Sequence, residues 1–267
     1  MYFYLYDAFL QDKKYTKLLS EIEARLIDLS IQGRTTKLNI LNDIKELILD
    51  AVKHGAETVV VLGDDKTISK AIGAVVNLPV TLGIIPIGDN NLLAKYLGIP
   101  EGLAACEVLS KRVKEQLDLG KVGNHHFAFY LKALSPHIKI ISANDQYTIT
   151  PMSSNMEVYI CNFRPADVQL STAGQKKFFV PHDGYLEVVI KNLRIPSLLN
   201  KIFLKDNRHQ NQDGQYTILP FKKIKLEAEG DHDVKLVLDD DRIIKPPVEI
   251  EVLPRKINLI VGRERTF

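Results

Sequence analysis

Two short polar turns carry the residues best suited to chemistry. Residues 63–67 read G-D-D-K-T and follow a β-branched run at residues 58–62, and residues 88–91 read G-D-N-N and follow an apolar run at residues 82–87. Glycine permits a tight bend, and the backbone amides that open a following helix attract anions. This arrangement is typical of an anion site. Each turn alone also has a simpler interpretation, in which Gly makes the bend and Asp or Asn caps the next helix.

The first half of the chain alternates strand and helix patterns, which would place both turns at one edge of a sheet. Helical spacing of apolar residues predicts helices at residues 15–29, 44–52, 67–76 and 90–97, and strand-like runs occupy residues 2–6, 35–40, 58–62 and 82–87. Such alternation indicates βαβ units with a parallel sheet. Ligands of these sheets bind outside the carboxyl ends of the strands, where both turns would lie.

The pattern changes beyond about residue 120, where short apolar runs are divided by Asn, Asp, Gly and Pro. These runs are residues 127–131, 138–141, 156–161, 177–180, 186–190, 218–226, 234–238 and 248–252, with one helical insert at 195–204. Their rhythm is typical of an antiparallel sandwich or barrel. We therefore predict an α/β domain at residues 1–120, rejoined by residues 255–267, and a β-sandwich domain at residues 121–254.

Composition excludes several classes of protein. The chain has 267 residues, 45% of them hydrophobic, and a net charge of +2 from 35 basic and 33 acidic side chains. This balance is typical of a globular protein and gives no general support for nucleic-acid binding. Its two cysteines match no metal-ligand spacing, no apolar run approaches the roughly 20 residues of a membrane span, and residues 1–7 lack a basic leader. A cytoplasmic location is the expectation, with no nucleic-acid partner.

Taken together, the two turns resemble the diacylglycerol kinase catalytic domain, a family that includes sphingosine kinases and bacterial lipid kinases and is distantly related to NAD kinases. The first family motif is G-G-D-G-T, and residues 63–67 lie over it. The second reads roughly L-G-I-I-P-x-G-T-x-N-D-x-A-R-x-L-G-I-P, and residues 82–100 follow it closely. Looser similarity is found at residues 113–123, 182–189 and 237–254. The family's N-P-x-S-G turn is missing, because residues 6–10 read Y-D-A-F-L.

The resemblance implies an enzyme that transfers the γ-phosphate of ATP to a lipid hydroxyl with the help of Mg²⁺, through positioning and charge neutralisation. The residues it places around the nucleotide phosphates are Gly63, Asp65, Lys66, Thr67, Gly88 and Asn91. Asp239 would be the base that accepts the hydroxyl proton, and Asp65 would be a second catalytic carboxylate. Asp118 and Asp241 would belong to the Mg²⁺ network.

Departures from the family motifs leave a second account open. Asp64 and Lys66 replace glycines, Asp89 replaces the Thr, and Leu92 replaces an acidic residue. An additional carboxylate beside a triphosphate is repulsive, although the Lys66 ammonium could offset this charge. The chain is therefore either a divergent kinase with a rebuilt phosphate turn or a fold retained for nucleotide or lipid binding without catalysis.

Partners are inferred from charge and from the resemblance. The basic amphipathic stretch at residues 190–208 could lie on an anionic membrane surface, or it could be a helix with a solvated basic face. The acidic run at residues 239–241 could equally be a solvated turn. The resemblance implies a lipid substrate, a peripheral position at the inner membrane face, and compatibility with a homodimer formed through the β domain.

Overall fold

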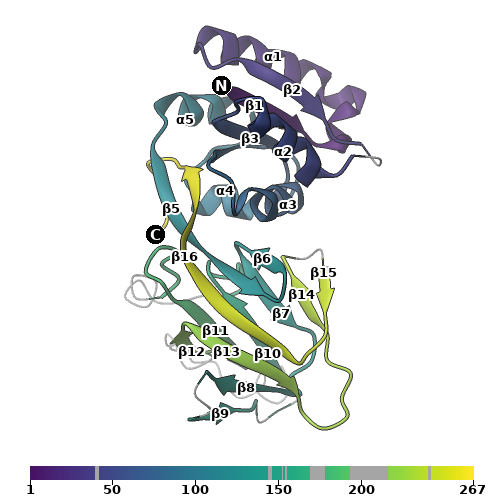
Figure 1. Cartoon of the computed structure of the whole chain (residues 1–267), viewed down its shortest axis with the longest axis vertical. Coiled ribbons are helices and arrows are strands. Elements are labelled where there is room, and N and C mark those ends of the chain that lie inside the picture. Colours follow the sequence, from purple (N-terminus) through teal and green to yellow (C-terminus); the bar gives the residue numbers. More distant parts are fainter. Residues whose placement is uncertain are drawn as a thin grey trace, which may run out of the picture. The chain divides into compact units, whose positions relative to one another are not determined.

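The computed structural model describes the whole chain except residues 40–41, 144–145, 152, 154, 169–177, 193–215 and 240–241. It divides into two compact units (Figure 1). Unit 1 comprises Met1–Leu119, His125–Ala128 and Leu253–Phe267, and unit 2 comprises Gly120–Asn124 and Phe129–Val252. The predicted helix at residues 195–204 and most of the basic stretch lie outside the described residues.

Unit 1 is built on the parallel sheet that the sequence predicts. Its strands are β1 (Tyr2–Tyr6), β2 (Gly33–Lys37), β3 (Thr58–Gly63), β4 (Thr81–Pro86) and the last part of β16 (Val248–Ile260). They lie in the order β2-β1-β3-β4-β16, and each neighbouring pair is parallel. The side chains of β1 and nearly all of those of β3 are buried, which explains their continuous apolar character.

Helices and short 3₁₀ turns connect these strands. The α-helices are α1 (Thr16–Asp28), α2 (Ile44–Lys53), α3 (Asp65–Val75), α4 (Leu92–Tyr96) and α5 (Ala105–Lys111), and the 3₁₀ turns are Ala8–Gln11, Lys13–Tyr15 and Gly102–Ala104. Helix α2 packs on α3. Helices α1 and α5 are joined by the Arg25 guanidinium, which donates through Nε to Glu107 Oε1 at 2.8 Å. Among the described helices, none is both long and apolar enough to cross a membrane.

Helix α2 begins with a side-chain cap, which gives a stability prediction. Asp43 Oδ1 accepts a hydrogen bond from the Lys45 amide at 2.8 Å. Replacing such a cap by Ala leaves the amide without this partner and typically costs about 1 kcal/mol. We expect Asp43→Ala to lower the free energy of unfolding by that amount in urea titration. Asp43→Ser, which keeps an acceptor oxygen, should stay close to wild type; equal losses in both variants would contradict the capping role.

The C-terminal residues return to unit 1, as the family resemblance leads one to expect. The Gly262 amide donates to the Leu97 carbonyl oxygen at 2.8 Å. A Cβ atom on Gly262 would lie only 1.7 Å from the Gly98 carbonyl oxygen, so only glycine permits this backbone approach. The end of β16 is therefore fixed beside the loop that follows α4.

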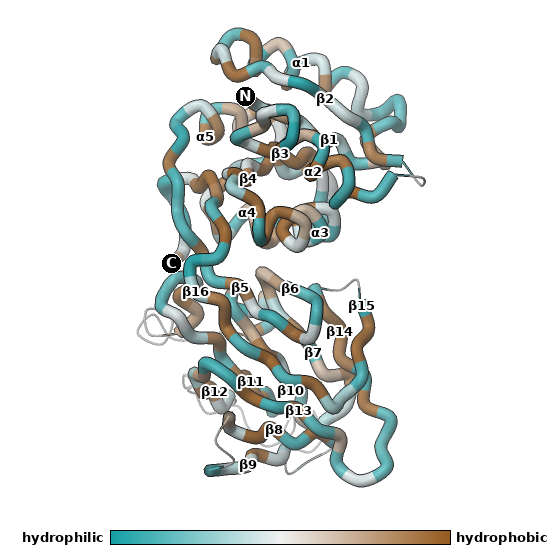
Figure 2. The backbone as a smooth tube through the Cα atoms, viewed as in Figure 1, coloured by the Kyte–Doolittle hydropathy of each residue, from teal (hydrophilic) through white to brown (hydrophobic). Residues whose placement is uncertain are grey.

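Unit 2 is antiparallel, which confirms the predicted fold class. Its six-stranded sheet has the order β12-β11-β10-β7-β14-β15, and β13, β8 and β9 extend from β16 in a second group. The strands are β7 (Tyr130–Ala133), β8 (Ile138–Ser142), β9 (Thr148–Ile149), β10 (Met156–Cys161), β11 (Leu186–Asn192), β12 (Tyr216–Phe221), β13 (Lys223–Ala228), β14 (Leu236–Leu238) and β15 (Arg242–Ile244). Hydrophobic and hydrophilic residues alternate along the first part of β16, as expected for a strand with one buried face (Figure 2).

Two further strands, β5 (Lys114–Val122) and β6 (His125–Phe127), form a hairpin, and both β5 and β16 run from one unit into the other. The strand predicted at residues 177–180 is wrong for its described part, because residues 178–180 form no strand. Phe179 has a φ of 61°, a left-handed conformation that an L-residue cannot combine with a regular strand.

Candidate functional site

The two glycine turns lie side by side at the carboxyl ends of β3 and β4. Gly63, the last residue of β3, pairs with Pro86 of β4. The Ile87 amide donates to the Gly63 carbonyl oxygen at 3.0 Å, and the Asp65 amide donates to the Asn90 carbonyl oxygen at 2.9 Å. The turns that the sequence singles out thus form one hydrogen-bonded structure.

The Asp65 carboxylate connects the start of α3 to the start of α4. Its Oδ2 accepts from the Leu92 amide at 2.6 Å, and its Oδ1 accepts from the Leu93 amide at 3.1 Å. Both oxygens therefore serve backbone donors that open α4, where a carboxylate is also favoured by the helix dipole. Asp65 has a structural role in addition to any chemical one.

Removing this connection should weaken unit 1 measurably. Hydrogen bonds to a charged group are each worth about 1.5–3 kcal/mol. The two amides that lose the carboxylate recover part of this free energy from water. We expect Asp65→Ala to lower the free energy of unfolding by about 2 kcal/mol in urea titration. Asp65→Asn keeps one acceptor oxygen and should lose less. An Ala variant as stable as the wild type would show that the two amide contacts contribute nothing.

Thr67, in the first turn, donates hydrogen bonds to two other carboxylates. Its amide donates to Asp64 Oδ1 at 3.1 Å, and its hydroxyl donates to Asp7 Oδ2. Asp7 follows β1, and its Oδ1 accepts from the Phe9 amide at 3.3 Å. A Cβ atom placed on Gly63 would lie 3.0 Å from Asp7 Oδ2, so the space over this glycine holds the Asp7 side chain.

The second turn is covered by an aromatic ring and contains an unpaired acceptor. Gly88 has a φ of 112°, and a Cβ atom there would lie 3.3 Å from Cζ of Phe9. Asn91 Nδ2 donates to the Gly88 carbonyl oxygen at 2.8 Å. Asn91 Oδ1 is buried and has no hydrogen-bond partner among the described residues. Lys66, between Asp65 and Thr67, is exposed.

The other predicted residues belong to other elements of the chain. Asp118 on β5 is fully buried, and its Oδ1 accepts a hydrogen bond from the Arg255 amide at 2.7 Å. Arg255 lies on β16 and has a φ of 48°. In unit 2, Asp239 has a φ of 43°, and its Oδ1 accepts from the Phe129 and Tyr130 amides at 3.2 and 3.1 Å. Asp241 lies outside the described residues. Within the described part of the chain, no three His, Cys, Asp or Glu side chains are grouped as metal ligands.

Asp7 and Phe9 are the site residues that motif comparison missed. They stand where the family has its N-P-x-S-G turn, so no motif letter drew attention to them. The available signal was position: an Asp placed directly after a buried strand of a parallel sheet lies at the ligand-binding edge.

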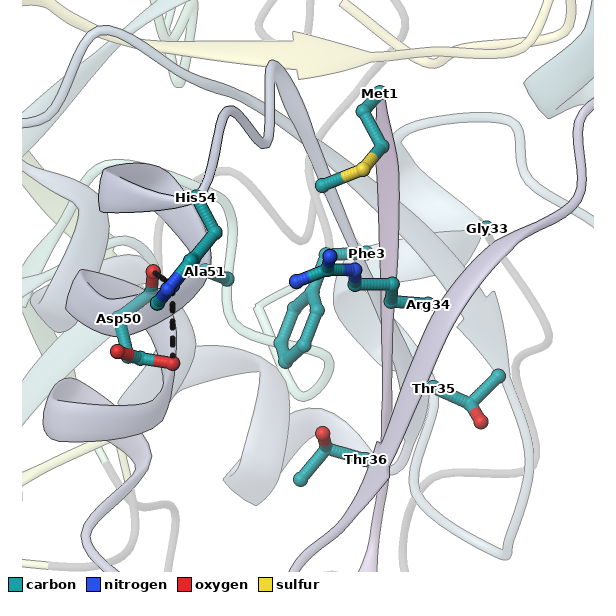
Figure 3. Close-up of a pocket in the computed structure, with 9 residues that line it drawn as sticks. All are labelled: Met1, Phe3, Gly33, Arg34, Thr35, Thr36, Asp50, Ala51 and His54. Carbon is teal, nitrogen blue, oxygen red and sulfur yellow. Dashed lines mark hydrogen bonds and ion pairs between the residues drawn. The ribbon is translucent and has the colours of Figure 1, made fainter.

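A cavity of about 400 Å³ lies at the opposite end of the sheet (Figure 3). It is lined by Met1, Phe3, Gly33, Arg34, Thr35, Thr36, Asp50, Ala51 and His54. Met1 and Gly33 stand at the amino ends of β1 and β2, and His54 stands at the carboxyl end of α2. His54 Nδ1 lies 2.8 Å from the Asp50 carbonyl oxygen. None of the residues predicted from the motifs lines this cavity.

Glu187 is a carboxylic acid of unit 2 whose pKa is strongly raised. Glu187 on β11 is 2% exposed, and burial is the main reason that its pKa rises to about 8. Its Oε1 accepts from the Phe179 amide at 3.1 Å, which opposes the rise, and Asp183 reinforces the rise. Oε2 has no hydrogen-bond partner in the structure.

Comparison with known proteins finds a family similar to the first part of the chain. Residues 5–122, which contain both glycine turns, match the sequence profile of the diacylglycerol kinase catalytic domain. This part of the chain is therefore similar to the diacylglycerol kinase catalytic domain, as the two motifs predicted.

Individual relatives extend the similarity over the full chain. Two proteins named as candidate lipid kinases, from Staphylococcus aureus strains MSSA476 and JH9, are each 25% identical over 264 residues, covering 87% of this chain and 86% of the relative. A diacylglycerol kinase structure from Bacillus anthracis has a TM-score of 0.77 at 16% identity and covers 99% of this chain and 97% of its own. A second B. anthracis structure, of a candidate diacylglycerol kinase, has a TM-score of 0.75 at 14% identity, covering 98% and 97%. At these identities the structures establish the fold.

Proposed function

We propose that this chain is a lipid kinase that transfers a phosphoryl group to a lipid hydroxyl of the diacylglycerol type. The observation that carries the proposal is the hydrogen-bonded pair of glycine turns at the carboxyl ends of β3 and β4, within the segment that matches the catalytic-domain profile. A parallel sheet binds ligands at this edge, and positioning of phosphates is most of what such chemistry requires.

ATP is the proposed phosphoryl donor, as the kinase family implies. The residues proposed around its phosphates are Gly63, Asp65, Lys66, Thr67, Gly88 and Asn91. The exposed Lys66 side chain could supply positive charge beside the Asp64 and Asp65 carboxylates. Asp239 is the proposed base, because a carboxylate can accept the proton of the attacking hydroxyl.

Mg²⁺ fits the described residues poorly. Asp118 is fully buried and uses one oxygen to hold the Arg255 amide, and the described residues contain no group of three metal-ligating side chains. The Mg²⁺ ligands proposed from the motifs are Asp118 and Asp241, of which only Asp118 is described. No role in the reaction is therefore derived for the metal ion.

A non-catalytic protein that binds a nucleotide or a lipid head group is the second candidate. It is favoured by the carboxylates of Asp7, Asp64 and Asp65, which already engage backbone or hydroxyl donors in the two turns. We also propose contact with an anionic membrane surface, from the basic stretch at residues 190–208, and a homodimer, from the family resemblance. These remain proposals, and the basic residues considered for membrane contact lie largely outside the described part of the chain.

The test is phosphate transfer to lipid. The protein is incubated with radiolabelled ATP and Mg²⁺ on vesicles of mixed lipids containing diacylglycerol, and the extracted lipid is counted, while calorimetry measures ATP binding. We expect label in the lipid fraction. ATP binding without any labelled lipid would reject the kinase and leave the binding protein.

A further inference from the structure

Asp7 and Asp64 both accept hydrogen bonds from Thr67 at the switch point of the parallel sheet. The chain leaves β1 for β2 on one side and then passes back over β1 to β3 on the other, as the order β2-β1-β3-β4 requires. Open parallel sheets bind ligands where the direction reverses, outside the carboxyl ends of the two strands. Asp7 directly follows β1, and Asp64 directly follows β3. The chain's own carboxylates therefore lie at the position expected for a ligand.

Both polar donors of Thr67 are taken by these carboxylates. The amide donates to Asp64 Oδ1 at 3.1 Å and the hydroxyl donates to Asp7 Oδ2. The Asp7 side chain also fills the space over Gly63, and the Phe9 ring covers Gly88. An amide and a hydroxyl at the start of an eleven-residue helix are the groups that would bind a phosphate oxygen.

Nucleotide phosphates therefore reach the Thr67 donors only if the Asp7 and Asp64 carboxylates leave them. A phosphate on Thr67 would meet two carboxylates, and like charges at short distance repel strongly when partly shielded from water. The residues responsible are particular to this chain, since Asp64 replaces a family glycine and Asp7 stands in place of the family's N-P-x-S-G turn.

A separate feature nevertheless indicates that the second turn accommodates a ligand. Asn91 is 9% exposed, its Oδ1 has no partner, and its Nδ2 is fixed on the Gly88 carbonyl oxygen. Buried acceptors are rarely left unpaired in native proteins. A ligand hydroxyl or amino group would satisfy this atom.

We infer that Asp7 and Asp64 act as an internal mimic of a phosphate group, so that a polyphosphate binds the two turns only by displacing them from Thr67. The inference rests on the proposed function, because it describes how that same site is regulated. Its consequence is that the two carboxylates hold polyphosphate affinity low in the wild-type chain.

Inorganic tripolyphosphate is the probe, titrated by calorimetry without metal ions into the full-length chain and its variants. Asp64→Gly restores the family residue, and Asp64→Asn and Asp7→Asn keep an acceptor oxygen for Thr67 while removing the charge. Each is expected to lower the dissociation constant about tenfold, corresponding to the removal of one partly screened charge. Asp43→Gly, which removes the equivalent cap of α2, is the matched control and should leave affinity unchanged.

The outcomes separate this inference from the proposed function. Equal tripolyphosphate affinity in the wild type and in both Asn variants would overturn the internal mimic, even if the wild type phosphorylates lipid. Tighter binding in the variants, accompanied by no lipid phosphorylation in any of them, would support the mimic and reject the kinase. The Asn variants each keep one acceptor oxygen that can serve Thr67, so the result does not depend on Asp64→Gly folding normally.

Discussion

Asp239→Asn is expected to reduce lipid phosphorylation by at least about a hundredfold, the lower end of what a positioned general base contributes. Asn cannot accept a proton as a carboxylate does, but its Oδ1 can still accept the hydrogen bonds from the Phe129 and Tyr130 amides. Asn also tolerates the φ of 43° observed at this position. The substitution therefore removes the proposed base while keeping its local structure.

Initial rates of label transfer, with thermal unfolding as the check on folding, measure this prediction. Asp233→Asn is the matched control, because Asp233 is an exposed acid of the same unit that pairs with Lys245 at 2.7 Å. The control should retain wild-type turnover. If Asp239→Asn also transfers phosphate at the wild-type rate, Asp239 is not the base.

Glu187→Gln is expected to stabilise the protein above neutral pH. The ordinary Glu pKa is 4.5, and burial raises that of Glu187 to about 8 in the folded chain. Below pH 4.5 the side chain is protonated in both states, so it adds no pH dependence. Between these two values the folded state holds a proton that the unfolded state has lost, so stability falls as pH rises. Above pH 8 the Glu187 side chain is ionised in both states, and its burial then lowers the free energy of unfolding by about 3–5 kcal/mol.

Urea unfolding at pH 5, 7 and 9 tests the direction of this pH dependence of stability. The advantage of Glu187→Gln over wild type should grow from pH 5 to pH 9. Glu157→Gln on the neighbouring strand β10 is the control of opposite sign: burial acts to raise the Glu157 pKa, but the Lys132 hydrogen bond and charge outweigh it and the pKa is lowered. This control should lose stability at pH 7. A Glu187→Gln variant with the same pH dependence as wild type would contradict the raised pKa.

Local patterns predicted the architecture well because the strands of unit 1 are buried along their length. The run at residues 58–62 became β3, the run at 2–6 became β1, and the helical spacing at 44–52 became α2. The same reasoning placed the glycine turns together, since neighbouring parallel strands end at the same edge. Local sequence patterns were sufficient to predict a strand or helix wherever its own residues determine its structure.

Strand boundaries were not predicted correctly where contacts with residues far away in the sequence determine the backbone conformation. We predicted a strand at residues 248–252, but β16 continues from Val248 to Ile260. Asp118 accepts a hydrogen bond from the Arg255 amide across 137 positions of sequence, at a residue with positive φ. The run predicted at 127–131 is likewise divided between β6 and β7, where Asp239 binds the Phe129 and Tyr130 amides. No local pattern contains such contacts.

The same limit applies to the candidate site. Motif letters identified Gly63, Thr67 and Gly88, yet they could not show that Asp7 and Phe9 occupy the space over the two glycines. That arrangement depends on the order of the strands, which brings the end of β1 beside the end of β3. Residue type and spacing predict which edge of the sheet carries the site. The side chains that lie over the two glycines are known only from the three-dimensional structure.

The central claim is that nucleotide phosphates bind at the two glycine turns, and amide hydrogen exchange with and without saturating ATP tests it most directly. The account predicts slower exchange for the amides of residues 64–67 and 88–93. We expect no change at residues 33–36, 50, 51 and 54, which line the cavity in Figure 3. Protection confined to the cavity residues, with unchanged exchange at both turns, would contradict the claim.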